Sequence, residues 1–205
     1  MSFLDKLASA IMPPESAQDR ANARKVAQGL AGDGDWLAIV LEQHRQIEAF
    51  FTQAMVAPDG PSRLAALKRL AVLLTGHANA EESVLYPAVS DGGEKGHAAM
   101  AYEEQAMTKV QMALIEKLDP MGKDWREKLE HIQGAVLHHM YEEEGTWFAE
   151  LQQHLPVAER PRLTRRFMEE FERYTRGPSA QERIHEPALQ MAAQQPATPS
   201  APMGK

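Results

Sequence analysis

Two glutamates stand four residues after a histidine in regions of helical periodicity. These pairs are His77 with Glu81 and His139 with Glu143. A spacing of four residues places both side chains on one face of a helix, with Cβ atoms about 5–6 Å apart, close enough to share one metal ion or to bridge two. Each histidine also continues a stripe of apolar residues, so both pairs are expected to face the core. Because an unpaired buried carboxylate is costly, the pairs predict a cation inside the protein.

A third histidine, His44, shares a helix face with Val40 and Ile47. The chain has no cysteine, so any metal ion would be held by nitrogen and oxygen atoms. Such ligands suit iron, manganese or zinc, and the cores of helical bundles are where di-iron carboxylate sites are found. A lone histidine or a lone His-x3-Glu pair is more often structural. The joint occurrence of three such elements favours a metal centre.

The two pairs also belong to an internal repeat. The segments 77–82 and 139–144 align, and the alignment selects His139 rather than its neighbour His138 as the inward residue. An aromatic residue follows nine positions after each histidine, at Tyr86 and Phe148. The repeat indicates that the two halves of the site are built in the same way.

The elements that must position these residues are helices. Helical periodicity dominates the chain, and proline and glycine cluster at only a few places. Long helices are expected over about 35–55, 62–86, 96–118 and 123–151. Because the connecting loops are short, the fold class predicted is all-α, an up-down-up-down four-helix bundle.

The expected organisation has four parts. An N-terminal helical extension covers 1–32, the bundle covers 33–155, a further helix covers 156–176, and the tail covers 177–205. The tail contains five prolines and no aromatic residue, so it cannot bury a core and is expected to be disordered.

Charge and hydropathy exclude several classes of protein. The 205 residues carry 22 lysines and arginines against 29 acidic residues, a net charge of −7 with no basic stripe, so we expect no nucleic-acid partner. No apolar run approaches the roughly 18–20 residues of a membrane span, so none is expected. Asp5 and Lys6 interrupt the apolar start, which favours an unprocessed, cytoplasmic protein.

The pattern resembles the hemerythrin-like, or HHE cation-binding, family over about residues 33–155. The motifs that carry the resemblance are His44, His77-x3-Glu81-Glu82 with Leu85-Tyr86-Pro87, and His138-His139-x3-Glu143-Glu144 with Phe148. The resemblance implies a four-helix bundle holding two non-haem iron ions joined by an oxo or hydroxo bridge. It implies that the iron ligands are His44, His77, Glu81, His139 and Glu143, with both glutamates able to bridge the ions.

The third helix departs from the family pattern, because Gln105 stands where the family usually has histidine. Glutamine is a poor iron ligand. A stripe of apolar residues at Met100, Met107 and Leu114 contains Glu104, so this helix is expected to present Glu104 to the metal. His97, seven residues before Glu104 on the same side, is the second candidate for completing the iron site.

The leading functional expectation is a di-iron protein that binds dioxygen or a related small ligand for storage, transfer or sensing. The alternative is a redox enzyme on the same centre, acting on peroxide or nitric oxide. A metal-free helical interaction domain would leave the buried histidines and glutamates unexplained. A ferritin-type site is disfavoured because its Glu-x-x-His spacing is missing from the inward faces.

Overall fold

The computed structural model describes residues 15–176, and all of the helices discussed below lie before Arg176. The predictions made for the first 14 residues and for the tail lie outside the described residues. The part that is described contains no strand, so the predicted all-α fold class is confirmed. Within it, no helix is long and apolar enough to cross a membrane.

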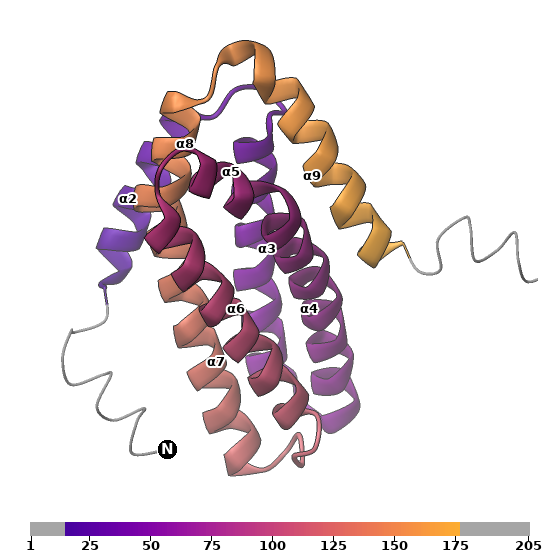
Figure 1. The fold of residues 1–205 in the computed structure, drawn as a ribbon. Coiled ribbons are helices and arrows are strands. Elements are labelled where there is room, and N and C mark those ends of the chain that lie inside the picture. Colours follow the sequence, from indigo (N-terminus) through magenta and orange to yellow (C-terminus); the bar gives the residue numbers. More distant parts are fainter. Residues whose placement is uncertain (1–14, 177–205) are drawn as a thin grey trace, which may run out of the picture. The chain divides into compact units, whose positions relative to one another are not determined.

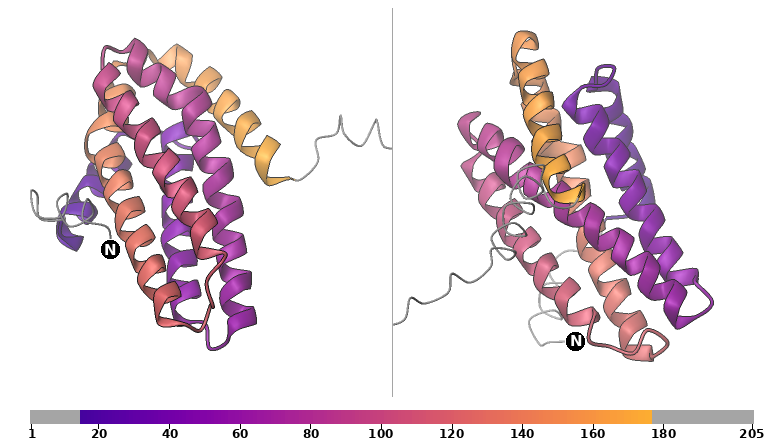
Figure 2. Two further views of the ribbon diagram at one scale, coloured as in Figure 1. Left: turned by 60° about the horizontal axis from the view of Figure 1, so that its bottom comes forward. Right: turned by 90° about the vertical axis from the view of Figure 1, so that its right-hand side faces the viewer.

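Four long helices form the bundle (Figure 1). They are α3 (Trp36–Val56), α4 (Gly60–Ala80), α6 (Lys95–Ile115) and α7 (Lys123–Glu142). Helix α3 packs against both α4 and α7, and α6 packs against α7 (Figure 2). The side chain of Asp35 accepts a hydrogen bond from the Ala38 N–H at the start of α3, and Asp59 caps α4 in the same way.

Two of the long helices continue through a π-helical turn. Helix α4 leads through η1 (Glu81–Leu85) into α5 (Tyr86–Asp91), and α7 leads through η2 (Glu143–Trp147) into α8 (Phe148–His154). The chain therefore stays helical past Pro87, which lies in the first turn of α5, where a missing N–H is tolerated. Both π turns begin at the glutamate of a His-x3-Glu pair, and such turns are frequent at functional sites.

One helix precedes the bundle in the sequence, and another follows it. Helix α2 (Ala17–Leu30) packs against α3, η2 and α8. After the short 3₁₀ turn η3 (Val157–Glu159), helix α9 (Arg160–Thr175) packs mainly against α4 and buries Phe167. Gly76 permits this approach, because a Cβ atom at that position would overlap Thr175 and crowd Phe171.

The apolar core is divided into two clusters by a polar layer. One cluster includes Trp36, Leu85 and Phe148, and the other includes Phe51 and Trp125. On α3, His44 lies between Val40 of the first cluster and Ile47 of the second, and on α4 His77 lies between Leu73 of the second and Ala80 of the first. Glu143 follows Met140 of the second cluster and precedes Trp147 of the first. The candidate site therefore lies in the middle of the bundle, enclosed by apolar side chains at both ends.

Helix α6 turns a different face inward from the one predicted. Met100, Met107 and Leu114 are exposed, with Met107 at 58%, so the expectation that they form the inward stripe is wrong. The buried face consists of Ala98, Ala101, Gln105, Met112 and Ile115. Alanine and methionine occur on both faces of this helix, so its apolar residues do not distinguish the inward side.

Truncation after Arg176 is expected to leave the melting temperature unchanged within about 1 °C, because the Pro-rich remainder lacks apolar periodicity. Differential scanning calorimetry of the full and shortened chains provides the measurement. A loss of several degrees would show that the tail packs against the rest of the protein.

Candidate metal centre

Four side chains from different turns converge at the middle of the bundle. His44 comes from α3, His77 from the end of α4, Glu81 from the start of η1 and Glu143 from the start of η2. One ligand atom of each lies within 4.8 Å of the others, and all four side chains are buried. The spacing of His77 and Glu81 on one helix brings His77 Nε2 to 3.0 Å from Glu81 Oε1.

Several buried polar atoms in this cluster make no hydrogen bond within the protein. His44 Nε2, Glu81 Oε1 and Glu143 Oε2 are buried and accept or donate no hydrogen bond. His44 Nε2 lies 3.4 Å from Glu143 Oε2 and 4.0 Å from Glu81 Oε1, so the three atoms face a common point. Buried polar atoms are almost always paired in native proteins. A cation bound between them would pair all three, so the residues present fit a metal ion.

The other carboxylate oxygens face a second group of side chains. Glu143 Oε1 lies 3.2 Å from His139 Nε2 and 2.9 Å from the hydroxyl of Tyr86. Glu81 Oε2 lies 3.2 Å from the same hydroxyl, which is also 3.0 Å from His139 Nε2. Each glutamate therefore turns one oxygen towards His44 and the other towards Tyr86. This division of the oxygens fits two neighbouring metal positions.

Helix α6 contributes Gln105 to this second group. Gln105 is 6% exposed, and its Nε2 donates a hydrogen bond of 2.6 Å to Glu81 Oε2 and another to the hydroxyl of Tyr86. The neighbouring Glu104 does not join the cluster of carboxylates; its Oε2 lies 2.7 Å from Nδ1 of His139, on the far side of the ring. The inward rotation of α6 at Gln105 accounts for both placements.

His97 lies away from the centre. It converges with Glu94 and Glu150, both of them at least partly exposed, and its ring stacks on Trp147 at a centroid distance of 5.8 Å. The structure thus gathers five of the seven sequence-predicted residues around the centre, places Glu104 behind His139, and places His97 elsewhere. Tyr86 is not among the seven predicted ligands, although it belongs to the internal repeat and to the motif that carries the family resemblance.

Each of the three central histidines is held through its other ring nitrogen. In each ring Nδ1 is within 2.8 Å of a side-chain oxygen, and Nε2 faces the centre. The pairs are His44 with Glu144, His77 with Gln43, and His139 with Glu104. Such contacts fix the ring orientation and leave the Nε2 lone pair for a metal, an arrangement found for most metal-binding histidines.

The charges in the cluster are strongly coupled. Burial by itself would lower the pKa of His139, but the carboxylates of Glu143 and Glu104 raise this pKa to about 10. Burial likewise opposes the rise in the pKa of His44, which Glu143, Glu144 and Glu81 carry well above its usual value. Burial and the charges of Glu143 and Glu81 raise the pKa of Tyr86 well above 10. Without a metal the carboxylates therefore favour the protonated forms of His139 and His44, and metal binding would displace these protons.

An arginine of α2 links the N-terminal extension to the centre. Arg24 makes two hydrogen bonds from Nε and one from Nη2 to the carboxylate of Glu144, all between 2.8 and 3.0 Å, and it also pairs with Glu48 of α3. Glu144 in turn lies 2.7 Å from Nδ1 of His44. The chain Arg24–Glu144–His44 therefore positions one of the central imidazoles from outside the four long helices.

Glu144→Ala is expected to weaken metal binding about 10- to 100-fold, because His44 loses the acceptor that orients its ring. Competition with a chromogenic chelator measures the change. Glu142→Ala, two residues earlier on the chain and only partly buried, is the matched control and should retain the affinity of the parent protein. Equal losses in the two variants would contradict a specific role for Glu144.

A helical bundle that encloses histidines and glutamates at its middle defines a metal-binding protein of the all-α class. The chain belongs to the hemerythrin family, because the family model for the hemerythrin HHE cation-binding domain matches residues 36–151. Both glutamates and all three central histidines lie within the matched segment.

A curated relative is the protein named DNA nickase of Nostoc sp. (strain PCC 7120 / SAG 25.82 / UTEX 2576), which is 26% identical over 117 residues. The aligned region covers 57% of this chain and 33% of the relative. The chain thus spans about a third of the length of that relative. No solved structure matches the chain.

Proposed function

We propose that the chain binds two non-haem iron ions and uses them to bind dioxygen or a related small ligand for storage, transfer or sensing. The observation that carries the proposal is the set of converging, buried ligand atoms on His44, Glu81 and Glu143 that make no hydrogen bond within the protein. Imidazole and carboxylate ligands without sulfur suit iron. Iron held in this way supplies either reversible binding or redox activation of small molecules such as dioxygen, peroxide and nitric oxide.

The roles of the side chains follow from their positions. His44 and His77 would hold one ion, and His139 would hold the other. Glu81 and Glu143 would each contribute one carboxylate oxygen to each of the two ions. Tyr86 holds its proton beside Glu143 Oε1, at 2.9 Å, and so can donate a hydrogen bond to a ligand bound at the second position. The apolar clusters on both sides of the polar layer limit the access of water along the bundle axis.

One observation favours the alternative of a redox enzyme acting on peroxide or nitric oxide. The second position offers a single histidine, with carboxylates, a phenol and an amide completing its surroundings. Oxygen-rich surroundings stabilise the more oxidised iron, and Tyr86 keeps a proton within reach of the site. Turnover of peroxide would use both features.

Iron content per chain, combined with optical spectra of the reduced and re-oxygenated protein, tests the proposal. We expect about two irons per chain and a spectrum that changes on oxygenation. Return of the original spectrum after dioxygen is removed supports reversible binding, and steady consumption of added peroxide supports the enzyme. A purified protein that neither contains nor takes up iron would refute both.

DNA nicking belongs to the Nostoc relative, and we propose a small ligand rather than nucleic acid as the partner of this chain. The matched region is a third of that relative, and the net charge of −7 opposes phosphate binding. Incubation of the iron-loaded protein with supercoiled plasmid should leave the plasmid intact. Conversion of the plasmid to the open circular form would overturn this part of the proposal.

A further inference from the structure

We propose that a pocket beside the metal centre binds a small neutral aromatic alcohol, a molecule of the phenol class. This site goes beyond the proposed binding of dioxygen or peroxide, and it is independent of which metal ion occupies the centre. Three features of the pocket carry the inference: its volume, the chemistry of its wall, and one buried acceptor at its inner end.

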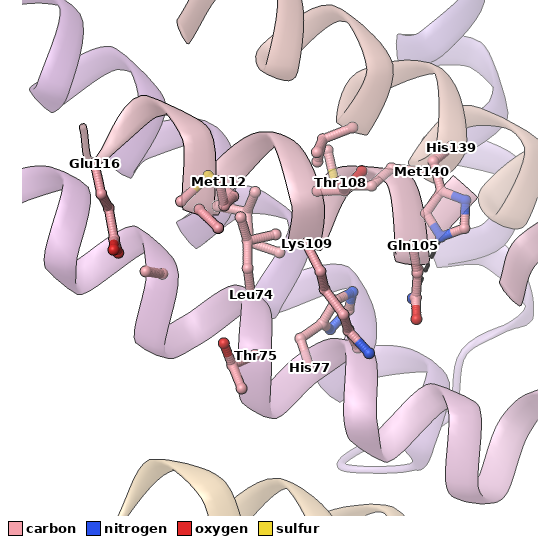
Figure 3. Close-up of a pocket in the computed structure, with 15 residues that line it drawn as sticks. Leu74, Thr75, His77, Gln105, Thr108, Lys109, Met112, Glu116, His139 and Met140 are labelled. Atoms are coloured by element: carbon pink, nitrogen blue, oxygen red, sulfur yellow. Dashed lines mark hydrogen bonds between the residues drawn. The ribbon is translucent and has the colours of Figure 1, made fainter. Parts of the chain in front are cut away.

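The pocket lies between α4, α6 and α7 and has a volume of about 230 Å³ (Figure 3). His77, Gln105 and His139 line its inner end, next to the centre. Most of the remaining wall is apolar, with contributions from Ile47, Leu74, Ala78, Met112, Val136 and Met140. The wall therefore favours an apolar ligand over water.

The volume is too large for a diatomic ligand alone. An apolar cavity of about 150 Å³ is enough to bind benzene. The pocket of this protein is larger, at about 230 Å³, so it accommodates a six-membered ring with a substituent. Dioxygen or nitric oxide would leave most of this apolar space unfilled.

Gln105 supplies the polar contact that a hydroxyl would make. Its Nε2 is already used by Glu81 and Tyr86, whereas its Oε1 is buried and has no hydrogen-bond partner. Figure 3 shows the oxygen of Gln105 directed away from the ring of His139. A buried acceptor without a donor is costly, so the inner end favours a ligand that presents an O–H group.

The charge at the rim favours a neutral ligand. Lys109 extends from α6 towards the opposite wall, where its Nζ lies 2.6 Å from Glu82 Oε1 and 3.5 Å from Asn79 Oδ1. Its charge is therefore balanced within the protein and does not require an anionic ligand. The wall, the acceptor and the paired lysine together specify an apolar ring with one hydroxyl group.

Calorimetric titration of the purified, metal-bearing protein with phenol and with fluorobenzene tests the inference. The two probes have similar rings, but only phenol donates a hydrogen bond. We expect phenol to bind with about tenfold higher affinity, because it satisfies the buried Oε1 of Gln105. Absence of phenol binding, or equal affinities for the two probes, would overturn the proposal.

Substitutions at two positions locate the site. Thr108 lines the pocket one turn from Gln105, so Thr108→Phe should fill the space and abolish binding of both probes, whereas Thr108→Ser should retain it. Gln105→Met keeps the length of the side chain and removes the acceptor, so it should lower phenol affinity about tenfold and leave fluorobenzene affinity unchanged. Unchanged phenol binding in Thr108→Phe would place the ligand elsewhere and refute the proposal.

The metal content of each protein sample separates this inference from the proposed function. If the protein takes up no iron but binds phenol, the pocket is supported and the di-iron proposal is refuted. If the protein is loaded with iron but does not bind phenol, the di-iron proposal is supported and the pocket is refuted. A new charge-transfer absorption band that appears with phenol and persists in Gln105→Met would place the hydroxyl on the metal and overturn the role of Gln105.

Discussion

His77→Ala is expected to remove most of the bound iron and to lower the melting temperature by about 5–10 °C. His77 Nε2 is one of the four ligand atoms that converge in the middle of the bundle. A ligand present at a hundred times its dissociation constant stabilises a protein by about 2.7 kcal/mol, and loss of that contribution corresponds to several degrees in a domain of this size. Elemental analysis and calorimetry give the two measurements.

The same result is expected for His139→Ala, and His131→Ala is its matched control. His131 lies on α7 two turns before His139, but it is exposed and takes no part in the centre. His77→Gln is a milder change of the same residue. It keeps a polar side chain beside Glu81 and Gln43 and is therefore expected to preserve the fold. Full iron content in both alanine variants would refute the assignment of these histidines. A loss of iron in His131→Ala would show that the effect is unspecific.

The fold was accessible from the sequence because its signals are local. The helical periodicity, the breaks at proline and glycine and the short connections predicted a four-helix bundle, and the structure confirms it. The same periodicity placed His44, His77 and His139 on inward faces, where the structure finds them buried. The apolar stripes on α3 and α7 are long and one-sided, so the polar residues that interrupt them are easily recognised.

The π turns were not predictable in this way. Each turn changes the hydrogen-bond pattern over only five residues, which is too short to alter the periodicity of the sequence. The shift nevertheless begins at Glu81 and at Glu143 and affects the direction of every side chain that follows, including Tyr86. The presence of Tyr86 in the site therefore depends on a local change of backbone geometry that the spacing of residues does not reveal.

Helix α6 shows a second limit of sequence patterns. Its methionines suggested an inward face, yet the inward face carries alanines and Gln105, and Met107 is exposed. Small side chains are needed where α6 approaches the polar layer, and the pocket between α4 and α6 takes up further space. Hydrophobicity alone selects the larger residues and so favours the wrong face. Family register, which aligns Gln105 with a histidine, was the better guide to this helix.

Gln105→His is expected to tighten the binding of the second iron ion about tenfold, because an imidazole replaces an amide that is a weak ligand for iron. The present side chain reaches Glu81 Oε2 at 2.6 Å and His139 Nε2 at 3.5 Å, so a histidine at this position would face the same two groups. Removal of iron by increasing concentrations of a ferrous chelator, followed by native mass spectrometry, distinguishes loss of one ion from loss of two.

Three further variants decide which residue of α6 serves the centre. Glu103→His adds an outward histidine to the same helix and should leave both iron affinities unchanged. Glu104→Ala should weaken the second ion about 10- to 100-fold, since His139 loses the acceptor for its Nδ1–H. Glu104→His tests whether the face of α6 that carries Glu104, rather than the face that carries Gln105, is turned towards the metal. If Glu104→His tightened the second ion and Gln105→His did not, α6 would present Glu104 to the metal in solution, and the assignment of Gln105 to the centre would be wrong.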